Sequence, residues 1–286
     1  MQEFPYGLQP SGSYFSIRDS VNPLMKKSWY ALSMAAFLIL GCENDDVPKS
    51  AGKLDYYIES YDLAGLGLDF TPQYKVAYQY DHDKLIRYTF FGYSPDSKSF
   101  VKQRYFDFSY VDGRVDKIKG FLPGASTHYI EYTYEYLPDS RVSKITEENN
   151  GTGINSVANF SYNDTDETVK VAYSYSNGGA FEYEFAYGSN NILTDKTTRG
   201  AQLCSDGAYT YDENHNPFYD LGYADYTLSN ISANNKLTED VNYAGCSFPS
   251  FIPESYSYEY NNVGYPTKAT TLYSSGGKSV KQFFYR

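Results

Sequence analysis

The sequence predicts an all-β protein: a large antiparallel meander of Tyr-rich hairpins, curled into a barrel or half-barrel, with one short irregular or helical insertion. Three observations support this prediction. The 286 residues include 34 tyrosines and 18 phenylalanines, and aromatic residues favour strands over helices. Aromatic side chains alternate with polar ones in short runs, which is the two-residue period of a strand with one buried face. The pattern then returns about every 25 residues, the length of one hairpin with its turns.

Residues 1–41 are expected to be an upstream extension followed by a secretory signal, with Met25 as the true start. Met25-Lys26-Lys27 is a positive start, and residues 29–40 are apolar but too few to span a bilayer comfortably. The run ends in Leu38-Ile39-Leu40-Gly41-Cys42, which resembles the lipobox of bacterial lipoproteins. The resemblance implies lipidation of Cys42 and a membrane anchor.

Residues 42–52 form an acidic linker in this interpretation. Glu43-Asn44-Asp45-Asp46 resembles the export signal that carries Bacteroidetes lipoproteins to the outer face of the outer membrane. The resemblance implies an outer-membrane, lipid-anchored and surface-exposed protein. A solvated linker on a protein that stays in the periplasm is the alternative.

Residues 53–286 are expected to form a single β-repeat domain. Its clearest hairpin is residues 106–118, in which Asp112-Gly113 supplies the positive φ angles of a two-residue turn. Counting outward from this turn pairs Val111 with Arg114 and Tyr110 with Val115. The same count then pairs Ser109 with Asp116 and Phe108 with Lys117, which places Lys117 on the aromatic face.

The repeat is marked by the last aromatic residue of each Tyr-x-Tyr-like strand. These anchoring tyrosines are Tyr80, Tyr110, Tyr136, Tyr162, Tyr187, Tyr211, Tyr260 and Tyr285. A basic residue follows most of them at a nearly constant distance. We expect these basic stems to pack over rings, and a basic groove for an anionic ligand is the alternative. They are Arg87, Lys117, Lys144, Lys170, Lys196 and Lys268.

The interval between Tyr211 and Tyr260 is about twice the repeat, so one hairpin is replaced or disguised there. Asn216-Pro217 is a turn signal that a short helix can follow, and the irregular insertion extends from Asn214 to Pro253. Cys204 and Cys246 flank it. In an exported chain these cysteines either form a disulfide that pins the insertion to the sheet or remain two buried thiols.

Composition excludes one class of partner. The formal net charge is −11, and an acidic surface repels phosphate backbones, so nucleic acid is not expected as a partner.

The Tyr-x-Tyr-Asp strands at Tyr78 to Asp81 and Tyr209 to Asp212, with Asp112-Gly113-Arg114-Val115, resemble the YD repeats of Rhs-type proteins. Together with Asn216-Pro217-Phe218 and Asn234-Asn235, residues 53–286 resemble a Bacteroidetes lipoprotein family of unknown function with a porin-like fold. The resemblance implies a curled antiparallel sheet and no catalytic residues.

No motif predicts catalysis, a metal or a cofactor. His82, His128 and His215 have no metal-binding spacing, and Asp81-His82-Asp83 occupies a turn position. Neither a Gly-x-Ser-x-Gly elbow nor a complete dinucleotide loop at Gly65-Leu66-Gly67 is present. Runs of oxygen ligands at Asn163 to Glu167 and at Asp212 to Asn214 lack the spacing of a calcium loop. Glu182 and Glu184 share a strand face but do not stand out as a glycosidase pair.

These observations favour a lipid-anchored, non-enzymatic envelope protein that serves as a scaffold or binds a glycan or protein ligand. The alternatives are an outer-membrane pore-like barrel and a carboxylate-based hydrolase. A binding site is expected in the insertion rather than in the repeats.

Overall fold

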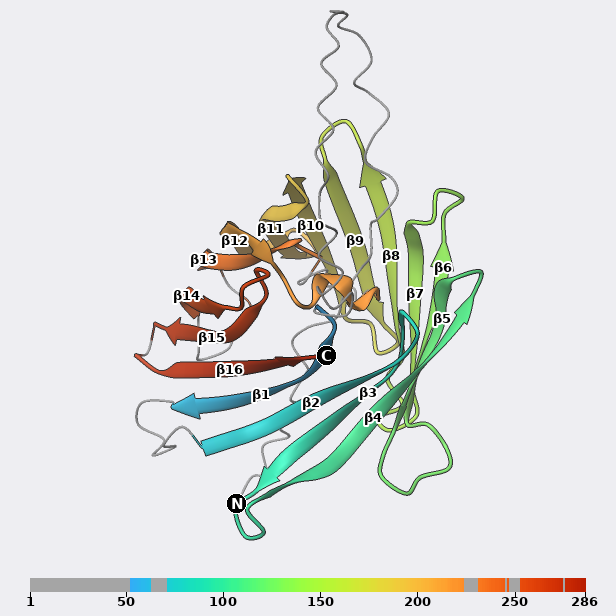
Figure 1. The fold of residues 1–286 in the computed structure, drawn as a ribbon. Coiled ribbons are helices and arrows are strands. Elements are labelled where there is room, and N and C mark those ends of the chain that lie inside the picture. The colour runs from blue at the N-terminus through green and yellow to red at the C-terminus, as the bar shows by residue number, and fades with distance from the viewer. Residues whose placement is uncertain (1–51, 63–70, 224–230, 245, 247–252, 275) are drawn as a thin grey trace, which may run out of the picture.

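The protein's structure is a computed structural model that describes residues 52–62, 71–223, 231–244, 246, 253–274 and 276–286. Within these residues, sixteen strands follow one another around a closed barrel, in which the last strand pairs with the first (Figure 1). The all-β prediction is confirmed, and closure decides between a barrel and a half-barrel. No helix in the described part of the chain has the length and apolar character needed to cross a bilayer.

Each strand pairs antiparallel with its neighbours in sequence, so that the chain forms a simple meander. The elements are β1 (Leu54–Asp62), β2 (Thr71–Asp81), β3 (Lys84–Ser94), β4 (Ser99–Val111), β5 (Arg114–Phe121), β6 (Ile130–Tyr136), β7 (Val142–Asn149), β8 (Ser156–Asn163), β9 (Thr168–Tyr175), β10 (Ala180–Gly188), β11 (Asn191–Arg199), β12 (Gln202–His215), the 3-10 turn η1 (Tyr219–Leu221), β13 (Asn234–Tyr243), β14 (Pro253–Tyr260), β15 (Pro266–Tyr273) and β16 (Lys278–Tyr285).

The barrel interior holds the aromatic face of the strands. Strand alternation places one set of side chains inside and the next set outside. Aromatic and aliphatic side chains fill the inner face of β2 to β10, where residues such as Phe106, Phe108, Ile118 and Val171 are buried. The predicted buried aromatic face is therefore the lining of the barrel.

The 106–118 hairpin pairs as predicted next to its turn and then shifts by one residue. Asp116 is an extra residue in a β-bulge, so Phe108 faces Ile118 and not Lys117. A bulge of one residue moves every later side chain to the opposite face. The predictions that Ser109 faces Asp116 and that Lys117 lies on the aromatic face are therefore wrong.

The basic residues singled out from the sequence point outward instead. Each contacts or lies in register with a carboxylate on a neighbouring strand, so the outer wall carries ion pairs. The expected packing over a ring is confirmed for Arg87, whose guanidinium lies 4.3 Å from the centre of the Tyr105 ring. Lys196 lies in register between Glu184 and Asp206. The other pairs are Arg87 with Asp107, Lys117 with Glu131 at 2.5 Å, Lys144 with Glu135 at 2.7 Å, Lys170 with Glu184 at 2.7 Å and Lys268 with Glu259 at 2.7 Å.

Six of the eight anchoring tyrosines, together with Tyr258 in place of Tyr260, form a ring of hydrogen bonds at one end of the barrel, and Tyr260 donates instead to Asp212. A tyrosine hydroxyl donates to the backbone carbonyl of the residue that is paired with the preceding anchor, so each repeat is tied to the one before it. Because β16 pairs with β1, the series of bonds continues from the last strand to the first. The bonds run from Tyr80 to Leu54 (3.0 Å), Tyr110 to Leu85 (2.7 Å), Tyr136 to Val115 (2.7 Å), Tyr162 to Val142 (2.9 Å), Tyr211 to Ile192 (2.6 Å), Tyr258 to Lys236 (2.8 Å) and Tyr285 to Pro266 (2.7 Å).

A register shift follows each of these acceptor residues. A bulge interrupts the ladder locally, which leaves the carbonyl before it available to a side-chain donor. The exception is the pairing of β8 with β9, which runs without a shift. It is also the place where the ring is interrupted: among the described residues, the hydroxyl of Tyr187 is the buried side-chain polar atom that has no hydrogen-bond partner.

Candidate functional site

The connection from β12 to β13 turns into the barrel and closes its tyrosine-ring end. We call its described residues, 216–223 and 231–233, the plug. The ring of Phe218 packs edge-on against Tyr57 and Phe283, with centroids 5.6 and 5.7 Å apart. The ring of Tyr223 packs against Phe108 at 4.9 Å. The helical turn η1 lies inside the ring of strands in Figure 1.

Asparagine side chains explain why the plug adopts this path. The carboxamide oxygen of Asn216 accepts from the Phe218 amide at 3.1 Å, which forms the predicted turn before Pro217. Its nitrogen donates to the carbonyl of Ser232 at 2.9 Å, which joins the two arms of the plug. The side chain of Asn234 in turn donates to the carbonyl of Asn214 at 3.1 Å. The predicted short helix is thus a single 3-10 turn that sits between these fixed ends.

A pocket of about 440 Å³ lies between the plug and the turns of the first hairpins. We call it the plug pocket. Its floor is apolar, because Leu54, Leu85 and Leu221 line it and are almost fully buried. Tyr80, Tyr110, Tyr219 and Tyr265 supply its aromatic walls, and its charged lining residues are Lys53, Asp83, Lys84 and Asp220.

The two lysines of the plug pocket differ in their partners. The ammonium of Lys53 binds Asp83 at 2.5 Å and lies 5.4 Å from the centre of the Tyr80 ring. The ammonium of Lys84 lies 5.3 Å from the centre of the Tyr110 ring and has no carboxylate partner among the described residues. Lys84 is therefore the cation that is available to an incoming group.

The pocket tyrosines act as hydrogen-bond donors over the physiological pH range. Burial raises the pKa of Tyr110 to about 12, and burial also raises the pKa of Tyr80. Both hydroxyls therefore stay protonated and keep their bonds to the carbonyls of Leu85 and Leu54. A ligand meets their rings rather than their hydroxyls.

A second polar cluster lies on the inner face of β11 to β14. We call Asp195, Tyr209, Lys236, Glu239 and Tyr256 the lumenal cluster. Glu239 accepts from Lys236 at 2.9 Å and from Tyr256 at 2.8 Å, and Asp195 accepts from Tyr209 at 2.7 Å. Burial raises the pKa of Asp195, although the Tyr209 hydroxyl and Lys236 partly offset the rise.

A similar arrangement continues on the inner face of β1 and its neighbours. Glu59 accepts a short hydrogen bond from Tyr74, and the ammonium of Lys281 lies 3.6 Å from its carboxylate. Polar side chains also lie inside the barrel on β7 to β9, where the buried Ser156 donates to Glu147 at 3.0 Å and accepts from Tyr173 at 2.8 Å.

The three histidines lie apart and do not form a site. His82 is an exposed turn residue 2.8 Å from Asp81, His128 lies 3.5 Å from Glu131, and His215 stacks on the ring of Tyr265. No group of three metal-ligating side chains occurs in the described part of the chain.

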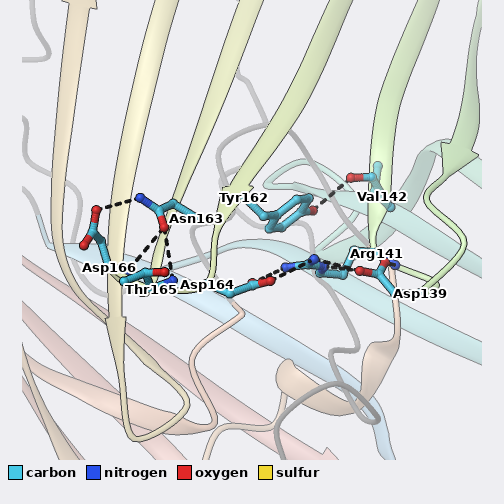
Figure 2. A network of polar contacts seen from close by, with 8 residues as sticks. All are labelled: Asp139, Arg141, Val142, Tyr162, Asn163, Asp164, Thr165 and Asp166. Atoms are coloured by element: carbon cyan, nitrogen blue, oxygen red, sulfur yellow. Dashed lines mark hydrogen bonds and ion pairs between the residues drawn. The ribbon is translucent and has the colours of Figure 1, made fainter.

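The carboxylates at Asn163 to Glu167 form a structural turn (Figure 2). Asn163 accepts from the amides of Thr165 and Asp166, and its nitrogen donates to the Asp166 carboxylate at 2.6 Å. Asp164 is bound by Arg141, whose guanidinium also lies over the ring of Tyr162 at 4.5 Å. The side-chain oxygens of Asn163, Asp164 and Asp166 are therefore engaged in hydrogen bonds within this turn or in the ion pair with Arg141.

The remaining predicted residues fall into two groups. Glu182 and Glu184 point to the outer wall, where Glu184 binds Lys170. Asp212, from the second predicted run of oxygen ligands, accepts from the Asn235 amide and from the Tyr260 hydroxyl. Gly65-Leu66-Gly67, the acidic linker and Cys42 lie outside the described residues.

Cys204 and Cys246 are joined by a disulfide, with Cα atoms 5.0 Å apart. Cys204 is fully buried at the start of β12, and Cys246 follows the end of β13. The bond lies at the barrel end opposite the plug, because it links the beginning of β12 to the end of β13. It therefore ties the last part of the predicted insertion to the start of β12 and does not hold the plug.

The sequence analysis named Tyr80, Asp83, Tyr110 and Tyr209 as turn or repeat residues and assigned none of them to a site, and it did not single out Lys84, Asp195 or Glu239. A signal for Lys84 was present, because a basic residue opens the second strand of several hairpins and lies over the next anchoring tyrosine. Arg114 lies over Tyr136 at 4.8 Å in the same manner. For Asp195 and Glu239, only the barrel's register shows which face of the strand is inside.

Two of the solved structures that are similar to this chain are porin-like proteins. A porin-like protein from Bacteroides uniformis matches with a TM-score of 0.54 at 11% sequence identity, and the match covers 82% of this chain and 99% of that one. A porin-like protein from Bacteroides vulgatus matches with a TM-score of 0.43 at 13% identity over 82% of this chain and 99% of that one. No protein-family model and no curated protein matches the sequence. The match to the Bacteroides uniformis protein shows that the chain has the porin-like β-barrel fold that the resemblance implied.

Proposed function

We propose that the protein is a non-enzymatic, lipid-anchored protein of the cell envelope whose barrel stands in water outside the bilayer and binds a small ligand at the plug. In this proposal the lipid on Cys42 provides the membrane attachment, and the barrel wall provides none. The proposed location is the outer membrane, with the barrel on the cell surface or in the periplasm.

The observation that carries the proposal is the polarity of the barrel wall. The outer face bears ion pairs on most of the strands, among them Lys117 and Lys119 on Glu131 and Lys170 on Glu184. The inner face is mainly aromatic and aliphatic. A membrane-spanning barrel has the opposite arrangement, and Lys or Arg on its lipid face costs about 2–4 kcal/mol near the midplane. The wall is thus better suited to water than to lipid.

The site chemistry is consistent with binding rather than catalysis. In the plug pocket, Lys53 is neutralised by Asp83, and the hydroxyls of Tyr80 and Tyr110 are engaged by backbone carbonyls. No nucleophile paired with a base lines the pocket. Its rings and leucines offer contact area, and Lys84 offers one charge.

Removal of the proposed lipid site tests the anchor. The full chain is expressed in a Gram-negative host, and the Cys42→Ala variant is expected to move from the membrane fraction to the soluble fraction with its barrel folded. Asn44→Ala is the matched control and is expected to stay with the membrane. If the Cys42→Ala protein stays in the membrane fraction and needs detergent for extraction, the barrel itself is embedded and the proposal is wrong.

A pore is the second candidate, and the lumenal cluster is the observation that favours it. The interior of water-filled membrane barrels is polar. Lys236 and Glu239 place an ion pair inside this barrel in the same way. The plug opposes this function because it fills one end of the barrel. Single-channel conductance of the full chain in planar bilayers would establish the pore. Bilayers that show no conductance when the protein is added would exclude it.

A further inference from the structure

A row of outward side chains crosses six neighbouring strands of the barrel wall, from β16 through β1 to β5. Their neighbours along the strands, such as Tyr57, Val76 and Phe106, belong to the core, so the row itself faces outward. The six strands are consecutive in the wall (Figure 1), and the row is therefore one continuous surface. We call it the outer strip. Its members, each in register with the next, are Phe284, Tyr56, Ala77, Thr89, Tyr105 and Phe121.

Aromatic pairs stand at both ends of the outer strip. Tyr56 stacks on Phe284 with ring centroids 4.3 Å apart, and Tyr105 stacks on Phe121 at 5.1 Å. The hydroxyls of Tyr56 and Tyr105 have no hydrogen-bond partner in the described part of the chain. Only small side chains lie between the two pairs, which are three strand spacings apart, roughly 14 Å. The strip thus offers two apolar contacts and two free hydroxyls along one line.

A lysine lies against each of the two aromatic pairs. The ammonium of Lys75 lies 3.8 Å from the centre of the Tyr56 ring, and that of Lys102 lies 4.1 Å from the centre of the Tyr105 ring. Neither lysine has a carboxylate partner among the described residues. Lys75 and Lys102 are therefore two positive charges beside the outer strip that the described protein does not neutralise.

The part of the wall across the barrel, β8 to β13, has a different outer surface. Small side chains such as Ala172, Ser174 and Ala208 face outward there, together with carboxylates such as Glu182 and Asp206. The aromatic girdles of a membrane barrel flank its apolar band at both interfaces. The rings of the outer strip instead occupy one side of the barrel, which fits contact with one partner in water.

We propose that the outer strip binds a linear glycan that carries anionic groups. The C–H faces of its sugars pack on the aromatic pairs, its hydroxyls bond the two free tyrosine hydroxyls, and its carboxylates or sulfates bind Lys75 and Lys102. The strip spans five strand spacings, roughly 24 Å, so it accommodates several sugar units. This site is separate from the plug and independent of the lipid anchor.

The topology of the barrel favours a glycan over an acidic peptide. An extended peptide commonly binds a sheet by adding a strand to a free edge. Closure of the sixteen strands leaves no free edge among the described residues. What the strip presents is side chains alone, and rings, hydroxyls and ammonium groups together match the surface of an acidic sugar.

Titration calorimetry on the full chain tests the outer strip with matched probes. Hexagalacturonate carries a carboxylate on every sugar, its methyl ester has the same chain without charge, and a heparin hexasaccharide carries sulfates. At least one of the two acidic glycans is expected to bind about tenfold more tightly than the methyl ester, as two surface charge contacts allow. The proposal is wrong if neither acidic glycan binds, if the methyl ester binds as tightly, or if poly-L-glutamate does.

Two double variants locate the interaction. Lys75→Gln with Lys102→Gln is expected to bind the preferred acidic glycan and the methyl ester equally, because it removes the groups that recognise the anion. Lys170→Gln with Lys196→Gln removes the same charge from the outer wall of β9 and β11 and is expected to keep the discrimination. If the two double variants behave alike, net charge rather than the outer strip determines binding, and the proposal is wrong.

Phe284→Thr tests the role of the rings. The Phe284 side chain is 37% exposed, so its replacement removes a surface ring and leaves the core in place, which near-ultraviolet circular dichroism verifies. The variant is expected to bind the acidic glycan and the methyl ester each about fivefold more weakly, the loss of one aromatic contact. Unchanged binding of both would contradict the proposed site. Fractionation of Cys42→Ala and these titrations can fail separately, so the two proposals are distinguishable.

Discussion

The hydroxyl of most anchoring tyrosines makes one specific bond to a backbone carbonyl, and the bond ties consecutive hairpins together. Tyr162 illustrates it, because its hydroxyl donates to the Val142 carbonyl at 2.9 Å while Arg141 covers its ring (Figure 2). Tyr187 is the counterexample. The ladder before it has no bulge, and its hydroxyl is buried without a hydrogen-bond partner.

Substitution of these two tyrosines should therefore have different effects. Tyr162→Phe is expected to lower the free energy of unfolding by about 1–2 kcal/mol, because it leaves the buried Val142 carbonyl unpaired. Tyr187→Phe is expected to leave it unchanged or to raise it, because the removed hydroxyl had no partner. Urea denaturation of both variants measures the difference. Equal losses in the two variants would contradict the assigned hydrogen bonds.

Asp195 is a second residue whose burial can be tested. Burial raises the pKa of this carboxyl in the folded protein, so the ionised form is disfavoured there. Its contribution to stability is then most favourable at low pH and is lost as pH rises through the folded pKa. Asp195→Asn is expected to raise the thermal midpoint at neutral pH, with the gain disappearing in acid.

The control for Asp195→Asn is Asp240→Asn, at an exposed position on the neighbouring wall. This control removes one negative charge from the same region without removing a buried one. It is expected to leave the thermal midpoint unchanged at both pH values. A similar gain in both variants would mean that net charge, rather than burial, determines the effect.

The repeating element is a hairpin with a bulge beside its anchoring tyrosine. Most hairpins are joined by long ladders, but β13 and β14 share a single paired position in the described residues, Thr238 with Ser255. Side chains compensate, since Tyr258 donates to the Lys236 carbonyl and Tyr256 to Glu239. Among the described residues, this pairing has the shortest ladder in the barrel.

Hydrogen exchange should identify the same joint. The amides of β14 that face β13 are expected to exchange well before those between β3 and β4, whose ladder is long. Mass spectrometry of peptides from both regions provides the comparison. Uniform protection of the two regions would show that β13 and β14 are paired as tightly as the other strands.

The disulfide joins β12 to the residues after β13 at the barrel end opposite the plug. Cys204 and Cys246 are 42 residues apart in sequence, and closing a loop of that length constrains the unfolded chain by about 3–4 kcal/mol. The double variant Cys204→Ala and Cys246→Ala is expected to lose that amount in urea denaturation. Peptide mapping without reduction should recover the two cysteines in one linked fragment, and free thiols at both positions would contradict the bond.

At the scale of the whole molecule, the barrel places its aromatic side chains inside and its ion pairs outside. The interior therefore holds many tyrosines whose pKa burial raises, to about 12 for Tyr110 and Tyr211 and further for others. Because their folded pKa exceeds the unfolded value, the stability they contribute is fully present below pH about 10. It is lost as pH rises through the folded pKa values.

The barrel is accordingly expected to unfold cooperatively in alkali, between pH about 10 and 12. Tyrosinate absorbance and far-ultraviolet circular dichroism should change together, because ionisation of the buried phenols requires opening of the barrel. A gradual rise in tyrosinate absorbance near pH 10 with an unchanged dichroism spectrum would show that the tyrosines are accessible in the folded protein.

The sequence by itself determined the strands, the hairpin period and the turn at Asn216-Pro217, because these depend on side-chain alternation and on local backbone preferences. It also marked the anchoring tyrosines. It could not determine the position of Lys117, since a one-residue bulge reverses the faces and leaves no reliable mark in composition.

Only the tertiary structure decided closure of the barrel and the direction of the plug. Both depend on contacts between residues far apart in sequence, such as Leu54 with Tyr285 and Phe218 with Tyr57. The pocket at Lys84 follows from the same contacts. The local sequence pattern determines the repeating hairpin. Pairing between strands far apart in sequence determines which charged side chains come together.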